Sequence, residues 1–157
     1  MANTSMSPAQ QANVRAAAGV NDAMLAVGRV LIAIIYIASG AQKFMGLSEV
    51  TAQLASKGFP MPNIFAIAAA ALELGGGILI VIGWQTRILA LALAVFTLIA
   101  AYFFHDFWHL PAGMEKTDNM IHFMKNISIV GGFLMLCAAG PGRFSLDGPC
   151  IRPELLK

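Results

Sequence analysis

The chain has 157 residues, of which 58% are hydrophobic and only 11% are charged, and its formal net charge is +2. Soluble domains carry about 25% charged residues, so this composition excludes an ordinary soluble domain and indicates an integral membrane protein. The small net charge, with basic residues dispersed singly along the chain, gives no reason to expect a nucleic-acid partner.

Residues 1–23 are polar and rich in alanine, and they contain no apolar core of the kind that a cleavable signal peptide has. We expect a tail and a surface helix that leads into the first span. Four apolar stretches follow, each long enough to cross a hydrocarbon core of about 30 Å with about 20 helical residues. The spans are predicted at 24–43, 64–83, 86–105 and 120–140. The prediction is an all-α, four-helix membrane bundle over 24–140, followed by a C-terminal tail at 141–157.

Three connections have distinct sequence signatures. The first contains a short amphipathic piece that includes Leu54 and ends at Gly58 and Pro60, which predicts a helix lying on the membrane surface. The second and third spans are joined by the short segment GWQT. The last span is expected to stop at GPGRFSLDGPC, because Gly140 and Pro141 do not extend a helix.

An even number of spans places both termini on one side of the membrane. That side carries Arg15, Arg87, Arg143, Arg152 and Lys157. The opposite side carries Lys43, Lys57 and Lys116. The excess of basic residues predicts that both termini lie in the cytoplasm.

One acidic side chain lies deep in the predicted membrane region. Glu73 is about ten residues from either end of its span, and therefore roughly 14 Å deep. A lone carboxylate there costs several kcal/mol, so we expect it to be protonated or paired with Arg29, Lys43 or Lys125. Two interpretations stay open: a structural ion pair that fixes helix register, with Arg29 or Lys125 as the partner, or a ligand or proton site. Arg29 can alternatively extend toward the lipid headgroups.

The three histidines all fall on the side opposite the termini. His105 and His109 have the i, i+4 spacing that lets two imidazoles share a metal on one helix, but no third ligand is in phase. Methionines such as Met120 and Met124 suit copper(I), yet methionine in an apolar chain usually packs, and we do not predict a metal site. Two histidines on different helices also leave haem ligation open.

The polar residues at this end of the bundle form a candidate ligand-binding site or proton path. The set is Lys43, Glu73, His105, His122, Lys125 and Asn126, with a possible aromatic rim from Phe103, Phe104, Phe107, Trp108 and Phe123. A flat ligand with carbonyl oxygens suits such a site, and a quinone head group is the obvious membrane candidate. Histidine or lysine would donate hydrogen bonds to its oxygens, and Glu73 could pass protons.

Five stretches of the chain, spread over residues 24–147, resemble one family. They are RVLIAIIYIASGAQKF, AALELGGGILIVIGWQTRILALAL, FFHDFW, FMKNISIVGGFLML and GPGRFSLD. Together they resemble the DoxX family of small bacterial membrane proteins. The resemblance implies a four-helix protein of the bacterial cytoplasmic (inner) membrane. It also implies a link to redox systems, since some relatives are named as quinone-reducing subunits and others belong to membrane oxidoreductase assemblies. The family positions carried over to this chain are Lys43, Glu73, His105, Lys125, Asn126 and Asp147.

Three functions therefore compete. The first is a quinone-binding oxidoreductase component; since the chain has no haem, flavin or iron–sulfur motif, it would need a bound quinone or a partner redox protein. The second is a non-catalytic anchor or assembly subunit, alone or as a homo-oligomer, with a sealed ion pair and no pocket. The third is a small transporter or metal-handling protein, which requires a polar path through the bundle or a true histidine and methionine cluster.

Overall fold

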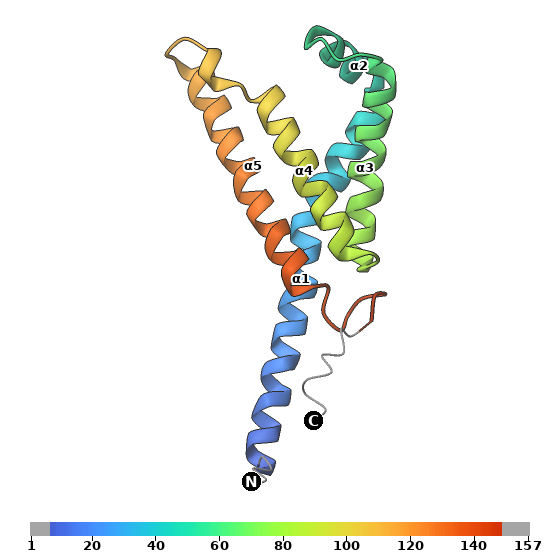
Figure 1. Ribbon diagram of the computed structural model, residues 1–157, viewed down its shortest axis with the longest axis vertical. Coiled ribbons are helices and arrows are strands. Elements are labelled where there is room, and N and C mark those ends of the chain that lie inside the picture. Colours follow the sequence, from blue (N-terminus) through green and yellow to red (C-terminus); the bar gives the residue numbers. More distant parts are fainter. Residues whose placement is uncertain (1–6, 149–157) are drawn as a thin grey trace.

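The computed structural model describes residues 7–148, and within them the chain is entirely helical apart from turns (Figure 1). The helices are α1 (Pro8–Met45), α2 (Leu47–Ser56), α3 (Pro62–Ile82), α4 (Thr86–Phe104), the short 3-10 helix η1 (Phe107–His109) and α5 (Met114–Ala139). Four of the described segments are long and apolar enough to cross a membrane, and they belong to α1, α3, α4 with η1, and α5. The predicted all-α bundle with four spans is confirmed.

The first span differs from its prediction at 24–43, because α1 begins at Pro8 and continues without a break through the membrane segment. Ser7 caps this helix: its hydroxyl accepts the N–H of Gln10, and the Gln10 side chain accepts the N–H of Ser7. The predicted surface helix is thus the first part of α1. Residues 1–6 and 149–157 lie outside the described residues, as does the side chain of Arg15.

The other predicted boundaries agree with α3 and α4 to within two residues. Helix α5 instead begins at Met114, earlier than the predicted 120, because its polar first turns are also helical. The predicted amphipathic helix is α2, in which Leu54 is buried, and the chain turns at Gly58 with φ 78°. The turn at GWQT is also tight, with positive φ at Gly83 and Gln85.

The four spans form two closely packed pairs, α1 with α3 and α4 with α5 (Figure 1). Glycines allow the first pair to approach closely: a Cβ on Gly40 would lie 2.9 Å from the Leu74 Cα, and one on Gly77 would lie 2.8 Å from the Ile37 Cγ1. The pairs meet near the α3–α4 turn and residues 140–148, which we call the turn end. They diverge toward α2 and η1, which we call the loop end.

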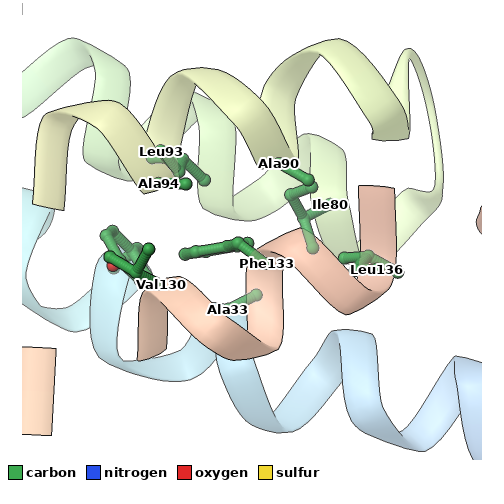
Figure 2. Close-up of a cluster of buried hydrophobic side chains, with 9 residues drawn as sticks. Ala33, Ile80, Ala90, Leu93, Ala94, Val130, Phe133 and Leu136 are labelled. Carbon is green, nitrogen blue, oxygen red and sulfur yellow. The ribbon is translucent and has the colours of Figure 1, made fainter. Parts of the chain in front are cut away.

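A cluster of buried apolar side chains holds the two pairs together in the half of the bundle nearer the turn end (Figure 2). Its members come from all four spans: Ala33, Tyr36, Ile80, Ala90, Leu93, Ala94, Val130, Phe133 and Leu136. Phe133 is fully buried, and its ring meets the ring of Tyr36 edge-on with centroids 5.2 Å apart. Large aliphatic side chains such as Leu31 and Ile88 point outward and contact the lipid bilayer.

Candidate functional site

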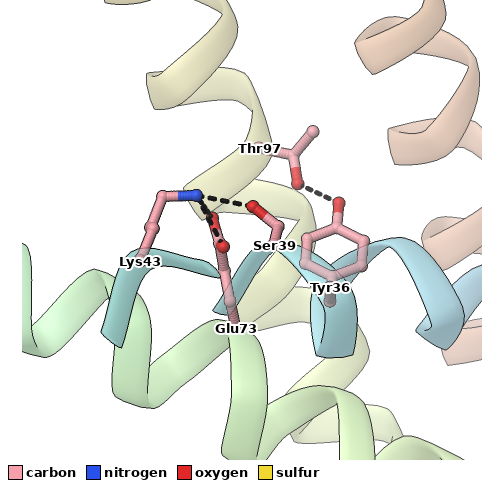
Figure 3. A network of polar contacts seen from close by, with 5 residues as sticks. All are labelled: Tyr36, Ser39, Lys43, Glu73 and Thr97. Carbon is pink, nitrogen blue, oxygen red and sulfur yellow. Dashed lines mark hydrogen bonds and ion pairs between the residues drawn. The ribbon is translucent and has the colours of Figure 1, made fainter. Parts of the chain in front are cut away.

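The buried carboxylate of Glu73 is paired with Lys43 (Figure 3). The Lys43 Nζ lies 2.7 Å from the Glu73 Oε2 and 3.0 Å from Oε1, and it also donates to the Ser39 hydroxyl at 2.6 Å. Ser39 and Lys43 are four residues apart, so both lie on the face of α1 that packs against α3. Lys43 thus provides the counter-ion that a carboxylate at this depth in the membrane needs.

Arg29 was the first alternative partner for Glu73, and that prediction is wrong. The guanidinium lies at the turn end, where Nη1 donates to the carbonyl oxygens of Ile80 and Val81, and Nη2 donates to that of Phe144. The side chain is 98% buried, since its exposed fraction is 2%, so it does not extend toward the headgroups either. The carbonyls at the end of α3 point out of the helix and carry the negative end of its dipole, which explains why a cation is held there.

Lys125 was the second alternative partner, and it does not reach Glu73. Its side chain is exposed on α5, and within residues 7–148 it makes no hydrogen bond or ion pair. Helix α5 diverges from α1 and α3 toward the loop end, which carries Lys125 away from the carboxylate (Figure 1). The ion pair therefore joins α1 to α3 and leaves α5 free of it.

A cavity of about 100 Å³ lies beside this ion pair, at the level where all four spans meet. It is lined by Ile35, Tyr36, Ser39, Glu73, Phe96, Thr97, Ala100, Asn126 and Ile129. The Thr97 hydroxyl donates to the Leu93 carbonyl at 2.6 Å, so its oxygen accepts the Tyr36 hydroxyl proton at 2.5 Å. One wall of the cavity is thus a set of oriented hydroxyl, amide and carboxylate groups, and the remainder is apolar.

The structure brings together only part of the predicted set. Glu73 and Asn126 line the cavity, and Lys43 lies directly behind Glu73. His105 and His122 instead stack on each other nearer the loop end, with ring centroids 5.1 Å apart and planes 16° from parallel. The aromatic residues Phe107, Trp108 and Phe123 also cluster at that end and do not line the cavity.

Three polar residues of the cavity were absent from the predicted site: Tyr36, Ser39 and Thr97. Tyr36 and Thr97 lie on the small and polar faces of their spans, so a hydroxyl group at membrane depth was the available signal. A neutral hydroxyl is a weaker signal than a charge, because it costs far less to bury in the membrane.

His105 and His109, which the i, i+4 spacing marked as weak metal candidates, do not form a helical pair. Helix α4 ends at Phe104, so His105 and His109 are not on one helix, and His109 lies 3.6 Å from the Asp106 carboxylate instead. Among the described residues, no three His, Cys, Asp or Glu side chains are grouped so that they could hold a metal.

Asp147 has a structural role at the turn end. Its carboxylate accepts the N–H groups of Gln85 at 2.7 Å and Thr86 at 2.9 Å, which caps the start of α4. The same segment is hydrogen bonded to the α3–α4 turn, since the N–H of Leu146 donates to Ile82 and that of Asp147 donates to Gly83. The segment GPGRFSLD therefore folds back over the turn end of the bundle.

The cap at Asp147 predicts a pH-dependent contribution to stability. Burial opposes ionisation, but the N–H groups of Thr86 and Gln85, with Arg29 nearby, outweigh it and hold the pKa of Asp147 below its ordinary value. A lowered pKa in the folded state stabilises the protein above the unfolded pKa of about 3.9, and this contribution is lost as pH falls through the folded pKa. Asp147→Ala should cost about 1 kcal/mol at neutral pH. In detergent unfolding measurements, this cost should shrink below about pH 4; a cost independent of pH would show that the charge contributes nothing.

Four lipid-exposed spans around an apolar cluster, with a polar cavity and a buried ion pair at their junction, define a small polytopic membrane protein. The family model of DoxX matches residues 24–106, which is more than half of the chain. The chain belongs to the DoxX family, and the predicted resemblance is confirmed.

Similar proteins support the same assignment. The chain is 41% identical over 124 residues to "Inner membrane protein YphA" of Escherichia coli (strain K12), covering 79% of this chain and 88% of that protein. It is 35% identical over 128 residues to "Inner membrane protein YqjF" of the same organism, covering 82% and 92%. A "Surfeit locus protein 4 homolog" of Schizosaccharomyces pombe is 28% identical over 121 residues, which cover 76% of this chain and 35% of that protein. No solved structure matches the chain significantly. The chain is an integral protein of the inner membrane.

Proposed function

We propose that the chain is the membrane component of a redox system and that a quinone-type ring binds in the cavity among the four spans. The observation that carries this proposal is the cavity itself, with five polar side chains at a depth where the surrounding surface is apolar. Its volume of about 100 Å³ is on the scale of one six-membered ring, since an engineered cavity of about 150 Å³ takes up benzene.

The side opening of the cavity favours a lipid-soluble ligand over a water-soluble one. Ile35 lines the cavity and is also 53% exposed on the outer surface of α1, within the membrane span. Asn126 and Ile129, on α5, line it from across the weakly packed α1–α5 contact. A ring can therefore enter from the bilayer between these helices while an isoprenoid tail stays in the lipid.

The lining offers the groups that a quinone needs. The Asn126 amide can donate to a carbonyl oxygen, and Glu73 can hold a proton beside the ring. A bound quinone would supply the redox chemistry, taking up two electrons and two protons to become a quinol. The electrons would come from a partner redox protein, since no cysteine lines the cavity.

The test is to purify the protein in detergent, extract it with organic solvent and quantify quinones by mass spectrometry. Wild type and Lys125→Ala should carry enriched quinone, because Lys125 is exposed and does not line the cavity. Asn126→Val and Glu73→Gln should each retain at least about fivefold less, as expected for a lost hydrogen bond of about 1 kcal/mol. Quinone absent from every sample, or equal in all four, would contradict the proposal.

A second candidate function is a membrane anchor for a redox partner, and helix α1 favours it. Its 38 residues span about 57 Å at 1.5 Å each, compared with a hydrocarbon core of about 30 Å. The excess projects beyond the bundle at the turn end, where a soluble protein could contact it (Figure 1). If this is the function, removing residues 8–18 should abolish co-purification of a cofactor-bearing protein while quinone stays absent from all samples.

The transporter alternative has less support. Between the cavity and Arg29, the buried side chains of the described spans form the apolar cluster of Figure 2, which offers no polar path across the bundle.

A further inference from the structure

We infer that the Glu73 carboxyl exchanges protons with the loop end of the bundle only, through Lys43, and that the cavity is sealed from the turn end. The inference deepens the proposed quinone site and rests on it for its biological meaning. It assigns the side of the membrane from which protons would reach a ligand in the cavity.

Toward the loop end, the ion pair connects the cavity to the surface. Glu73 lines the cavity and has a side chain only 6% exposed, whereas the Lys43 side chain is 27% exposed. Lys43 lies in the last turn of α1, which ends at Met45, so its backbone is near the boundary of the span while its ammonium group points inward to Glu73. When Lys43 swings away from the 2.7 Å contact, water from the loop end can reach the carboxylate.

Toward the turn end, apolar packing closes the bundle. Tyr36 and Arg29 are seven residues apart on α1, which corresponds to about 10 Å along the axis. The level between them is filled by fully buried Ala33, Ile80, Leu93 and Phe133, together with Ala90. Close apolar packing of this kind leaves no room for water, and without water or a polar side chain there is no carrier for a proton.

The other polar contact of the cavity does not bypass this seal. The Tyr36 hydroxyl donates to Thr97 (Figure 3). Thr97 in turn donates to the backbone carbonyl of Leu93. A carbonyl oxygen accepts a hydrogen bond but has no proton to pass on, so this series of hydrogen bonds ends inside α4.

Among the groups that face Glu73, Lys43 carries the charge that governs its protonation. Helix α1 presents Lys43, Ser39 and the Tyr36 phenol, α4 presents Thr97, and α5 presents Asn126. Within residues 7–148, Lys43 is the only cation within ion-pair distance of Glu73, and α2 places no charged group there. Protonation of Glu73 therefore opens one ion pair, and the proton arrives on the side where Lys43 lies.

The test uses dicyclohexylcarbodiimide, an apolar reagent that adds to a protonated carboxyl group and forms a stable N-acylurea with no leaving group. The full chain is reconstituted in vesicles with one orientation, the pH on each face is set independently, and the Glu73 adduct is quantified by peptide mass spectrometry. Lowering the pH on the loop-end face should raise the labelling rate by up to about tenfold per pH unit. Lowering it on the turn-end face should leave the rate unchanged. Glu73→Gln gives the background.

Two variants make the result decisive. Phe133→Ala removes the central ring of the seal, and its labelling should respond to pH on both faces. Lys43→Met removes the counter-ion, so Glu73 should label faster at every pH. The inference would be overturned if the labelling rate of the wild type responded equally to the pH on both faces, or only to the pH on the turn-end face. Labelling of Glu73 in Lys43→Met but not in the wild type would also overturn it. If labelling of Phe133→Ala responded to pH on the loop-end face alone, Phe133 would not be part of the seal.

The outcome is separable from that of the proposed function. Bound quinone with two-sided labelling would defeat the inference and leave the quinone site standing. One-sided labelling without bound quinone would defeat the quinone proposal and leave the proton connection standing.

Discussion

Replacing Lys43 with alanine is expected to lower the free energy of unfolding in detergent by about 3 kcal/mol, because it leaves the Glu73 carboxylate buried without a counter-ion. This value is at the low end of the range for buried pairs, since the Lys43 side chain is 27% exposed and remains partly solvated. The measurement is equilibrium unfolding of the purified protein by titration with a denaturing detergent.

The Lys57–Asp106 pair provides the matched control for this prediction. Its atoms are 3.3 Å apart, but both side chains are about one-third exposed. Lys57→Ala should therefore have a much smaller effect on stability than Lys43→Ala. The double variant Lys43→Met, Glu73→Gln should recover most of the lost stability, because it removes both charges together. If Lys43→Ala costs no more than Lys57→Ala, the folded protein holds Glu73 in its neutral form.

Arg29→Leu is expected to destabilise the turn end by roughly 3 kcal/mol, because it removes the guanidinium donor from the partly buried carbonyl oxygens of Val81 and Phe144 and leaves that of Ile80 with the Gly83 N–H alone. The loss should also release residues 140–148 from the bundle. Amide hydrogen exchange reports this directly: the N–H groups of Leu146 and Asp147, which bond to Ile82 and Gly83, should lose their protection.

Two variants test whether the guanidinium geometry or only the charge is responsible. Arg29→Lys should show an intermediate loss, because an ammonium group keeps the charge but lacks the fork that reaches two segments at once. Arg87→Leu, at an exposed position of the same end, should change stability by less than about 0.5 kcal/mol. Unchanged exchange at Leu146 and Asp147 in Arg29→Leu would show that Arg29 does not hold the segment.

The number and approximate place of the spans were predictable because spanning is a local property. A run of about 20 apolar residues suits the bilayer whatever its neighbours are, and residues such as Pro62 and Gly83 mark the ends of α3. The starts of α1 and α5 were not predictable in this way. Both helices extend into polar segments outside the apolar window, where hydropathy carries no information about where a helix begins.

The site was likewise predictable only in its local properties. The need of Glu73 for a counter-ion followed from its depth alone, because burying a charge is costly wherever the helix points. The identity of that counter-ion did not follow, since Arg29, Lys43 and Lys125 all lie on other helices at accessible positions. Only the pairing of α1 with α3, permitted by the missing side chains of Gly40 and Gly77, turns Lys43 toward the carboxylate.

The sequence by itself therefore determined the membrane location, the four spans, the family and the presence of a buried charge that requires compensation. The tertiary structure decided which cation provides it, which hydroxyls join it at the cavity, and how residues 140–148 close the turn end. The physical reason is that hydropathy and burial cost act along a single segment. The rotation of each helix about its axis and its choice of neighbour depend instead on contacts between segments distant in the chain.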